Sequence, residues 1–432
     1  MNNLTRYFGR SLFLVYANYL LIAYAFLLPT FPKAASVVMI LIGFLAFTAE
    51  DVQNRFIRTV KDKIIIAFLL FYFMHITWLF GSEHITSALL KLKDFKYILY
   101  IVILAMVIKE EFIKKILYSF LMAIAFSVLT SYAMFLNLQI PLIYLNSHPY
   151  IAFSVPFMLS YTQYGSILSL SAGISFFFFL KEQNSSNYLR FFYLVLFIAI
   201  SVDVFIIPSR IGHALYFISI AVVVLSLYHR YFYRSLIVII LISTIVFSIA
   251  YQYSNDFASR VNTLSSDIHL LRENNFSTSM GIRAGYYVYG LKVIAENVYV
   301  GVGIADHIPV TAEKIRALEK NPVNLNALLF ATESGHNASF ESEFLDITLQ
   351  FGVIGLLVFL NIFYQIIKYP TKLLLLKTIQ FLLIGDMLFL SVGSVIFIAS
   401  DIGKIFILLT ALTLLPKTTT PPSPQKGTSS TS

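Results

Sequence analysis

The chain has 432 residues, of which 58% are hydrophobic and 12% are charged, and its formal net charge is +9 at pH 7. Soluble globular domains carry about 25% charged residues, so this composition excludes a soluble protein and indicates a polytopic membrane protein. The absence of cysteine from the sequence excludes disulfide bonds, a thiolate nucleophile and sulfur ligands for a metal.

Long apolar runs predict an all-α membrane protein, because a spanning helix needs about 20 mostly apolar residues and an open sheet cannot cross lipid. We predict about twelve transmembrane helices. They lie near residues 11–30, 34–49, 63–81, 97–109, 115–136, 163–180, 188–207, 211–228, 235–252, 344–366, 374–396 and 397–415.

One long polar stretch divides these runs, and it gives the predicted domain organisation. Helices 1–9 occupy residues 1–252, and helices 10–12 occupy residues 344–415. Between them, residues 253–343 are expected to form a large, partly helical loop. Residues 416–432 are rich in Pro, Ser and Thr, a composition typical of a disordered tail.

The lysines and arginines of the short loops set the orientation. They collect on the side that also holds the N-terminus, whereas residues 137–162 on the other side contain neither Lys nor Arg. Because basic loops stay in the cytoplasm, both termini are predicted inside and the long loop outside. The net charge of +9 is largely this bias, so it does not indicate nucleic-acid binding.

Basic residues on the outer side are exceptions to this bias. Lys91, Lys93 and Lys96 stand where the chain re-enters the membrane, and Arg210 stands at the mouth of the eighth span. The lysines either bind an anionic substrate or extend to lipid headgroups. A guanidinium after Pro-Ser is suited to bidentate phosphate binding. His213 shares a helix face with Arg210, where it either contacts the same ligand or packs within the bundle.

The long loop carries a predicted amphipathic helix that begins near Arg283. Its apolar positions recur at helical spacing through Tyr287, Leu291, Ile294 and Val298, which favours a helix lying along the membrane surface. Gly301-Val302-Gly303 would end it. This glycine pair is not a dinucleotide fingerprint, because no strand–turn–helix unit surrounds it.

His336 stands in a polar Gly-His-Asn turn just before the tenth span. A neutral imidazole there is suited to act as a general base, and the alternative is a solvent-exposed loop histidine. The nearby Glu333, Glu341, Glu343 and Asp346 either ligate a divalent cation, orient the histidine or are hydrated boundary charges. Since the sequence has no H-E-x-x-H or paired-aspartate motif, we predict no metal site and no cofactor.

These features together resemble the O-antigen ligase and O-antigen polymerase superfamily of bacterial inner-membrane proteins. The resemblance rests on the layout of the spans, on the ordered motifs over roughly residues 205–360 and on their spacing. The motifs are Ser209-Arg210-Ile211-Gly212, the stretch from Arg283 to Gly303, and His336-Asn337 before Phe351-Gly352-Val353-Ile354-Gly355. A long Ser-Phe-Glu-Ser-Glu segment after the His-Asn pair departs from the pattern and makes Glu341 or Glu343 an alternative to His336.

The resemblance implies an inverting glycosyltransferase of the inner membrane with its active site facing the periplasm. Its donor would be a glycan on undecaprenyl diphosphate, and its acceptor a hydroxyl of lipid A–core. Arg283 and Arg210 would stabilise the leaving diphosphate, and His336 would take the acceptor proton. Substrate-binding residues would be Lys93, Lys96, His213 and Glu341.

Other functions remain open at this point. An O-antigen polymerase needs nearly the same residues and differs in its acceptor. Protein O-oligosaccharyltransferases are also similar, but commonly carry a further periplasmic domain at the C-terminus. A transporter or flippase is typical of twelve spans, but the halves show no similarity and charges within the spans are few. The main ones are Asp203, Asp386, Asp401 and Lys404.

Overall fold

A computed structural model describes residues 2–138, 154–157, 159–181, 187–330, 339–371, 373–398 and 400–414. Every regular element in these ranges is a helix, which confirms the predicted all-α class for the described chain. Most of the predicted apolar runs correspond to one helix each.

The first part of the chain, up to Phe135, folds into helices of very different length. They are α1 (Asn2–Thr30), α2 (Pro32–Thr48), α3 (Val52–Val60), α4 (Lys63–Trp78), η1 (Leu79–Gly81), α5 (Ile85–Phe95), η2 (Lys96–Leu99), α6 (Tyr100–Val107) and α7 (Glu110–Phe135).

The later helices fall into three sets. Apolar helices come first: α9 (Tyr161–Lys181), α10 (Asn187–Ile206), α11 (Arg210–Tyr228), η4 (His229–Tyr231) and α12 (Phe232–Tyr253). More polar helices follow: α13 (Asn255–Arg272), α14 (Ser279–Glu296), α15 (His307–Leu318) and α16 (Pro322–Phe330). The chain then returns to apolar helices: α17 (Glu343–Lys368), α18 (Leu374–Gly393) and α19 (Ser400–Thr413).

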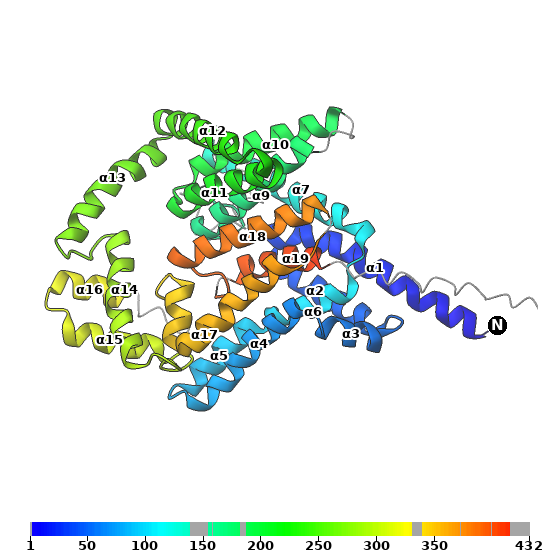
Figure 1. The fold of residues 1–432 in the computed structure, drawn as a ribbon, viewed down its shortest axis with the longest axis horizontal. Coiled ribbons are helices and arrows are strands. Elements are labelled where there is room, and N and C mark those ends of the chain that lie inside the picture. The colour runs from blue at the N-terminus through cyan, green and yellow to red at the C-terminus, as the bar shows by residue number, and fades with distance from the viewer. Residues whose placement is uncertain are drawn as a thin grey trace, which may run out of the picture.

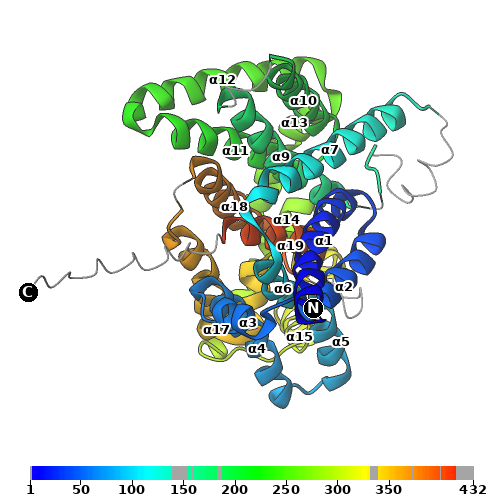
Figure 2. The same ribbon diagram turned by 90° about the vertical axis from the view of Figure 1, so that its right-hand side faces the viewer.

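The apolar helices form one bundle, and α13–α16 stand at its side. In Figure 1, α13 leads away from α12, and α14–α16 lie beside one end of α17. Figure 2 shows α10–α12 on one side of the bundle and α4, α5 and α17 on the other, with α18 in contact with both α11 and α17. Helices α14–α16 form a polar unit, and this unit with its α14–α15 loop covers one end of α4, α5 and α17.

Small side chains let the central helices approach closely. A Cβ on Gly165 of α9 would lie 2.9 Å from Ser209, and one on Gly212 of α11 would lie 3.0 Å from Gly165 Cα. The Ser169 hydroxyl donates a hydrogen bond across this contact to the Gly212 carbonyl at 2.8 Å. Membrane helices pack through small residues and interhelical hydrogen bonds of this kind.

The number of membrane spans differs from the predicted twelve. Within the described residues, eight helical stretches are long and apolar enough to cross a membrane, or nine if α2 and α3, bent by 112°, count as one. The longest, Arg210–Tyr253, has 44 residues and contains α11 and α12. By contrast, α2, α6 and α19 have only 17, 8 and 14 residues, which is short of the roughly 20 that a span needs. The count of twelve is thus not confirmed.

Candidate active site

The loop that follows α14 connects three parts of the structure. The Trp78 indole nitrogen donates to the Val300 carbonyl at 2.7 Å, and the Ser82 hydroxyl donates to the Ile304 carbonyl at 2.9 Å. The Asp306 carboxylate accepts hydrogen bonds from the backbone N–H of Glu83 and His84 at 3.0 and 3.1 Å. These bonds fasten the loop to the turn between α4 and α5.

The same loop docks on a break in α17. Gly352 has a φ of 64° inside this helix, so its neighbours leave the helical hydrogen-bond pattern. Val302 N–H donates to the Leu349 carbonyl at 2.8 Å, and Val353 N–H donates to the Val298 carbonyl at 2.8 Å. Backbone bonds therefore join the loop to α17 on both sides of the break, which satisfies groups that a membrane-facing helix cannot leave unpaired.

Glycine is required on both sides of this contact. Gly301 has a φ of 68°, and a Cβ there would lie 2.5 Å from the Leu349 oxygen. A Cβ on Gly352 would lie 2.3 Å from the backbone of Tyr299. Only a residue without a side chain fits such a close backbone approach at positive φ.

A buried group of ionisable side chains lies beside this loop, where α5, α15 and α17 meet. Lys91, His307 and Asp346 are at most 5% exposed. The Lys91 ammonium donates to Nε2 of His307 at 3.4 Å, and that nitrogen lies 3.7 Å from Oδ1 of Asp346. Asp346 also accepts from Ser339 and from the backbone N–H of Phe340. Ser339 and Phe340 are the first described residues after the segment that contains His336, and both bind Asp346 of this group.

Burial determines the charge states of the two bases. It lowers the pKa of Lys91 to about 8, against the opposing attraction of Asp346, Glu343 and Asp306. Burial, together with the nearby Lys91, lowers the pKa of His307 well below its usual value, so the imidazole is neutral at physiological pH. Its Nδ1 has no hydrogen-bond partner among the described residues.

The other carboxylates at this end of α17 also have protein partners. Glu343 is 1% exposed, and its Oε2 accepts from the N–H groups of Ile396 and Phe397 at 2.7 and 3.3 Å. Glu341 pairs with Arg283. In the part of the chain that the structure describes, no group of three or more His, Cys, Asp or Glu residues has the arrangement of a metal site.

Arg283 lies close to the same segment. It stands in the first half of α14, with its Nη2 2.5 Å from Oε2 of Glu341 and its Nη1 3.3 Å from the Ser279 hydroxyl. Tyr287, one turn later, makes a 2.7 Å hydrogen bond with Ser342. His336 itself lies in residues 331–338, outside the described residues. Glu341 follows it by five positions, so Arg283 is held beside the chain that leads from this histidine.

The predicted helix after Arg283 is confirmed as α14, but its buried face differs from the apolar stripe in the sequence. The buried residues include Tyr286, Tyr289 and Val293, whereas Leu291 is 57% exposed. A Cβ on Gly285 would lie 2.6 Å from a Leu328 methyl carbon. Two glycines let α14 pack closely on α16 and α17. These contacts, and not the apolar stripe in the sequence, determine which face of α14 is buried. The helix ends at Glu296, five residues before the predicted glycine stop.

The remaining predicted site residues lie apart. Arg210 begins α11, where its guanidinium donates to Asp267 at 2.8 Å and to the Thr263 hydroxyl at 2.9 Å. His213 is buried, with its Nε2 3.1 Å from the Ile207 carbonyl. Of the two alternatives that the sequence left open, this histidine therefore packs within the bundle. Among the described residues, no hydrogen bond or ion pair joins Arg210 to Arg283.

Of the three lysines near the second outer turn, the buried one is Lys91. Lys93 and Lys96 are exposed, and on a helix they point away from Lys91 because residues two or five positions apart face different sides. His307 was missed by the sequence analysis, which searched for cations at membrane boundaries. Its only sequence signal is the Asp306-His307 pair directly after the glycine loop.

Replacing Lys91 by methionine tests the buried group. Because the pKa of Lys91 is about 8 in the folded chain and 10.5 ordinarily, the unfolded chain holds more protons between these pH values. The wild type therefore gains stability relative to Lys91→Met as the pH rises from about 8 towards 10. Apparent thermal midpoints in detergent would measure this, with the exposed Lys93→Met as the control. A difference between wild type and Lys91→Met that is constant over pH would contradict the assignment.

Comparison with known proteins relates a central part of the chain to a family. A family model described as "O-Antigen ligase" matches residues 195–360. The matched range runs from α10 into α17, so it contains Arg210, Arg283, His307 and Asp346, whereas Lys91 lies outside it. No curated protein matches the chain.

Proposed function

The match over residues 195–360 supports placing the chain in the O-antigen ligase and polymerase superfamily, and on this premise we propose that it is a ligase. It would transfer a glycan from undecaprenyl diphosphate to a hydroxyl of lipid A–core, on the periplasmic side of the bacterial inner membrane. The observation that carries the proposal is the position of Arg283 within the matched domain, paired with Glu341 on the chain that leads from His336.

Arg283 is suited to stabilise the negative charge that develops on the leaving diphosphate. The bond between the anomeric carbon and the diphosphate oxygen breaks, and the electron pair leaves with undecaprenyl diphosphate. Preorganised cations stabilise such developing charge, and a guanidinium binds phosphate oxygens in a bidentate way. Arg283 is mostly shielded from solvent, and its Nε has no partner among the described residues. In this proposal Glu341 holds the guanidinium until the diphosphate replaces it.

The acceptor hydroxyl forms the new bond to the anomeric carbon, and its proton passes to a base. We assign this role to His336, whose unperturbed pKa near 6.5 suits proton transfer at neutral pH. Attack opposite to the leaving diphosphate inverts the anomeric centre. Arg210 supplies positive charge at a second position, where Asp267 now binds it.

The buried Lys91, His307 and Asp346 fit a positioning role. Asp346 binds Ser339 and Phe340, which follow His336 by three and four residues. In this proposal, fixing these two backbone positions limits where the chain can place His336. Second-layer contacts of this kind hold reactive groups in productive geometry.

The His336→Ala variant is expected to leave lipid A–core without O-antigen in cells, because the acceptor would lose its base. The loss of rate would be about 100-fold or more, in the range of general-base contributions. Electrophoresis of lipopolysaccharide from a deletion strain complemented with each variant would measure it. An Asn326→Ala variant, changed in α16 of the same polar unit, is the matched control and should restore wild-type bands.

The same gel separates ligase from polymerase. Cells without the ligase keep lipid-linked polymer and have unsubstituted core, whereas cells without the polymerase still cap cores with single repeats. Single-repeat capping in the deletion strain would assign the polymerase activity instead. Normal lipopolysaccharide in both the deletion strain and the His336→Ala strain would contradict the proposal as a whole.

A further inference from the structure

Two adjoining cavities lie at the opposite end of α4 and α17 from the candidate active site. The first, of about 440 Å³, opens between the start of α4 and the end of α17. The second, of about 620 Å³, opens between α3, α4 and α6, and both are lined by Lys61, Asp62 and Tyr369. The 16 residues of α4 rise about 24 Å, so most of a bilayer core separates these cavities from the candidate active site.

Positive charge dominates the lining of both cavities. One acidic residue, Asp62, is present, and its carboxylate accepts a hydrogen bond from the backbone N–H of Ile64 at 2.9 Å, as the N-cap of α4. The basic lining residues are Arg55, Arg58, Lys61, Lys63, Lys109 and Lys368. They belong to the basic loops that the charge bias places in the cytoplasm.

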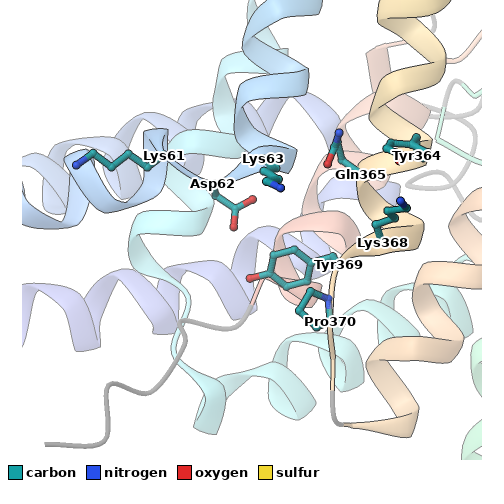
Figure 3. A pocket seen from close by; sticks show the side chains of 8 residues that line it. All are labelled: Lys61, Asp62, Lys63, Tyr364, Gln365, Lys368, Tyr369 and Pro370. Carbon is teal, nitrogen blue, oxygen red and sulfur yellow. The ribbon is translucent and has the colours of Figure 1, made fainter. Parts of the chain in front are cut away.

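Figure 3 shows how the first cavity is built. Asp62 and Lys63 come from the start of α4, Gln365 and Lys368 come from the end of α17, and Tyr369 lies below them. Lys61 extends away from this group along α3, and it also lines the second cavity. Two ammonium groups from different helices therefore border one opening.

The second cavity adds an apolar wall to this basic border. Its lining includes hydrocarbon side chains of α1, α4, α6 and the end of the described chain. Among these are Leu14, Ile65, Val107 and Leu414. A ligand that fits both cavities therefore has an anionic head and a hydrocarbon chain.

The short helix α3 has the form of an interfacial helix. It is bent by 112° from α2, and it exposes Phe56 and Ile57 beside Arg58. An amphipathic helix with this mixture lies at the boundary of headgroups and acyl chains. The Arg55 guanidinium donates to the carbonyls of Ala46, Glu50 and Met106 at 3.0–3.1 Å, which fixes α3 against α2 and α6.

We propose that these cavities bind an anionic phospholipid of the leaflet opposite to the candidate active site. Its phosphate lies between Lys63 and Lys368, Arg58 and Lys61 border the rest of the headgroup, and one acyl chain lies along the wall of Ile65 and Val107. Basic pockets between membrane helices on the cytoplasmic side are suited to such headgroups. The inference rests on the cavities alone and does not depend on the transferase assignment.

Native mass spectrometry of the full-length chain in neutral detergent would test the site. Purified protein would be titrated with cardiolipin, phosphatidylglycerol and phosphatidylethanolamine. We expect the two anionic lipids to bind at least tenfold more tightly than phosphatidylethanolamine. The double variant Lys63→Gln/Lys368→Gln should lose about tenfold in this affinity, because each juxtamembrane cation contributes to anionic lipid binding.

A matched double variant removes the same charge elsewhere on the predicted cytoplasmic side. Lys181→Gln/Arg230→Gln changes two exposed basic residues outside the cavities and should bind lipid as the wild type does. Arg58→Gln serves as a second single-site probe and should weaken binding by a smaller factor. Equal affinity for anionic and zwitterionic lipid, or equal loss in the two double variants, would overturn the proposal.

Discussion

Arg283→Ala is expected to abolish detectable glycan transfer while the chain still accumulates in the membrane. The guanidinium lies 2.5 Å from the carboxylate of Glu341, which follows His336 by five positions. Removing one preorganised group that stabilises developing negative charge costs a factor of about 10²–10³ in rate. The measurement is transfer from purified lipid-linked glycan to lipid A–core, followed by gel electrophoresis.

Two further variants make the result specific. Arg283→Lys keeps the charge but loses the planar fork, so its activity should lie between that of the wild type and that of Arg283→Ala. Arg316→Ala removes an exposed arginine of α15 in the same polar unit and should keep wild-type activity. The role of Arg283 would be falsified by full activity of Arg283→Ala, or by an equal loss in Arg316→Ala.

Gly352→Ala is expected to have the largest effect on stability. Gly352 has a φ of 64° and a ψ of −160°, a conformation that is essentially restricted to glycine and costs other residues about 1–3 kcal/mol. A Cβ there would also lie 2.3 Å from the backbone of Tyr299. Because backbone cannot swing aside as a side chain does, the loop would leave α17. We expect the apparent thermal midpoint in detergent to fall by about 5 °C or more, with a lower yield of membrane-inserted protein.

The control is a glycine whose added methyl group meets only ordinary contact. A Cβ on Gly43 of α2 would lie 3.5 Å from Ile103 Cδ1, and its backbone is helical. Gly43→Ala should therefore leave the thermal midpoint within about 1 °C of the wild type. Equal midpoints for Gly352→Ala and the wild type would show that the loop does not require a glycine at the break.

The long apolar runs predicted most of the spanning helices, because lipid forces each spanning segment to satisfy its own backbone hydrogen bonds. The prediction failed where backbone groups are satisfied by contacts with other parts of the chain instead of within one helix. The continuous run at residues 97–109 contains α6, which has only eight residues, and the break inside α17 carries no signal beyond Gly352. A run of apolar residues does not predict where a helix bends, or where it ends before it has the length of a full span.

The site was predicted only in part, for a reason that lies in its chemistry. Arg210 and Arg283 stood out because cations on the outer side oppose insertion. Lys91 gave the same signal as Lys93 and Lys96, and only the packing of α5 separates the buried one from the exposed two. His307 gave no signal beyond the adjacent Asp306, since its partners Lys91 and Asp346 lie more than 35 positions away on either side.

The break in α17, which the loop at residues 298–303 bridges by backbone hydrogen bonds, has a consequence for folding during synthesis. The ribosome synthesises residues 298–303 about fifty residues before Gly352, and chains fold in the order of their synthesis. The loop whose carbonyls and N–H groups complete the interrupted helix is thus already made when the second half of α17 leaves the ribosome. The earlier loop therefore provides backbone hydrogen-bond partners for α17 as soon as that helix is synthesised.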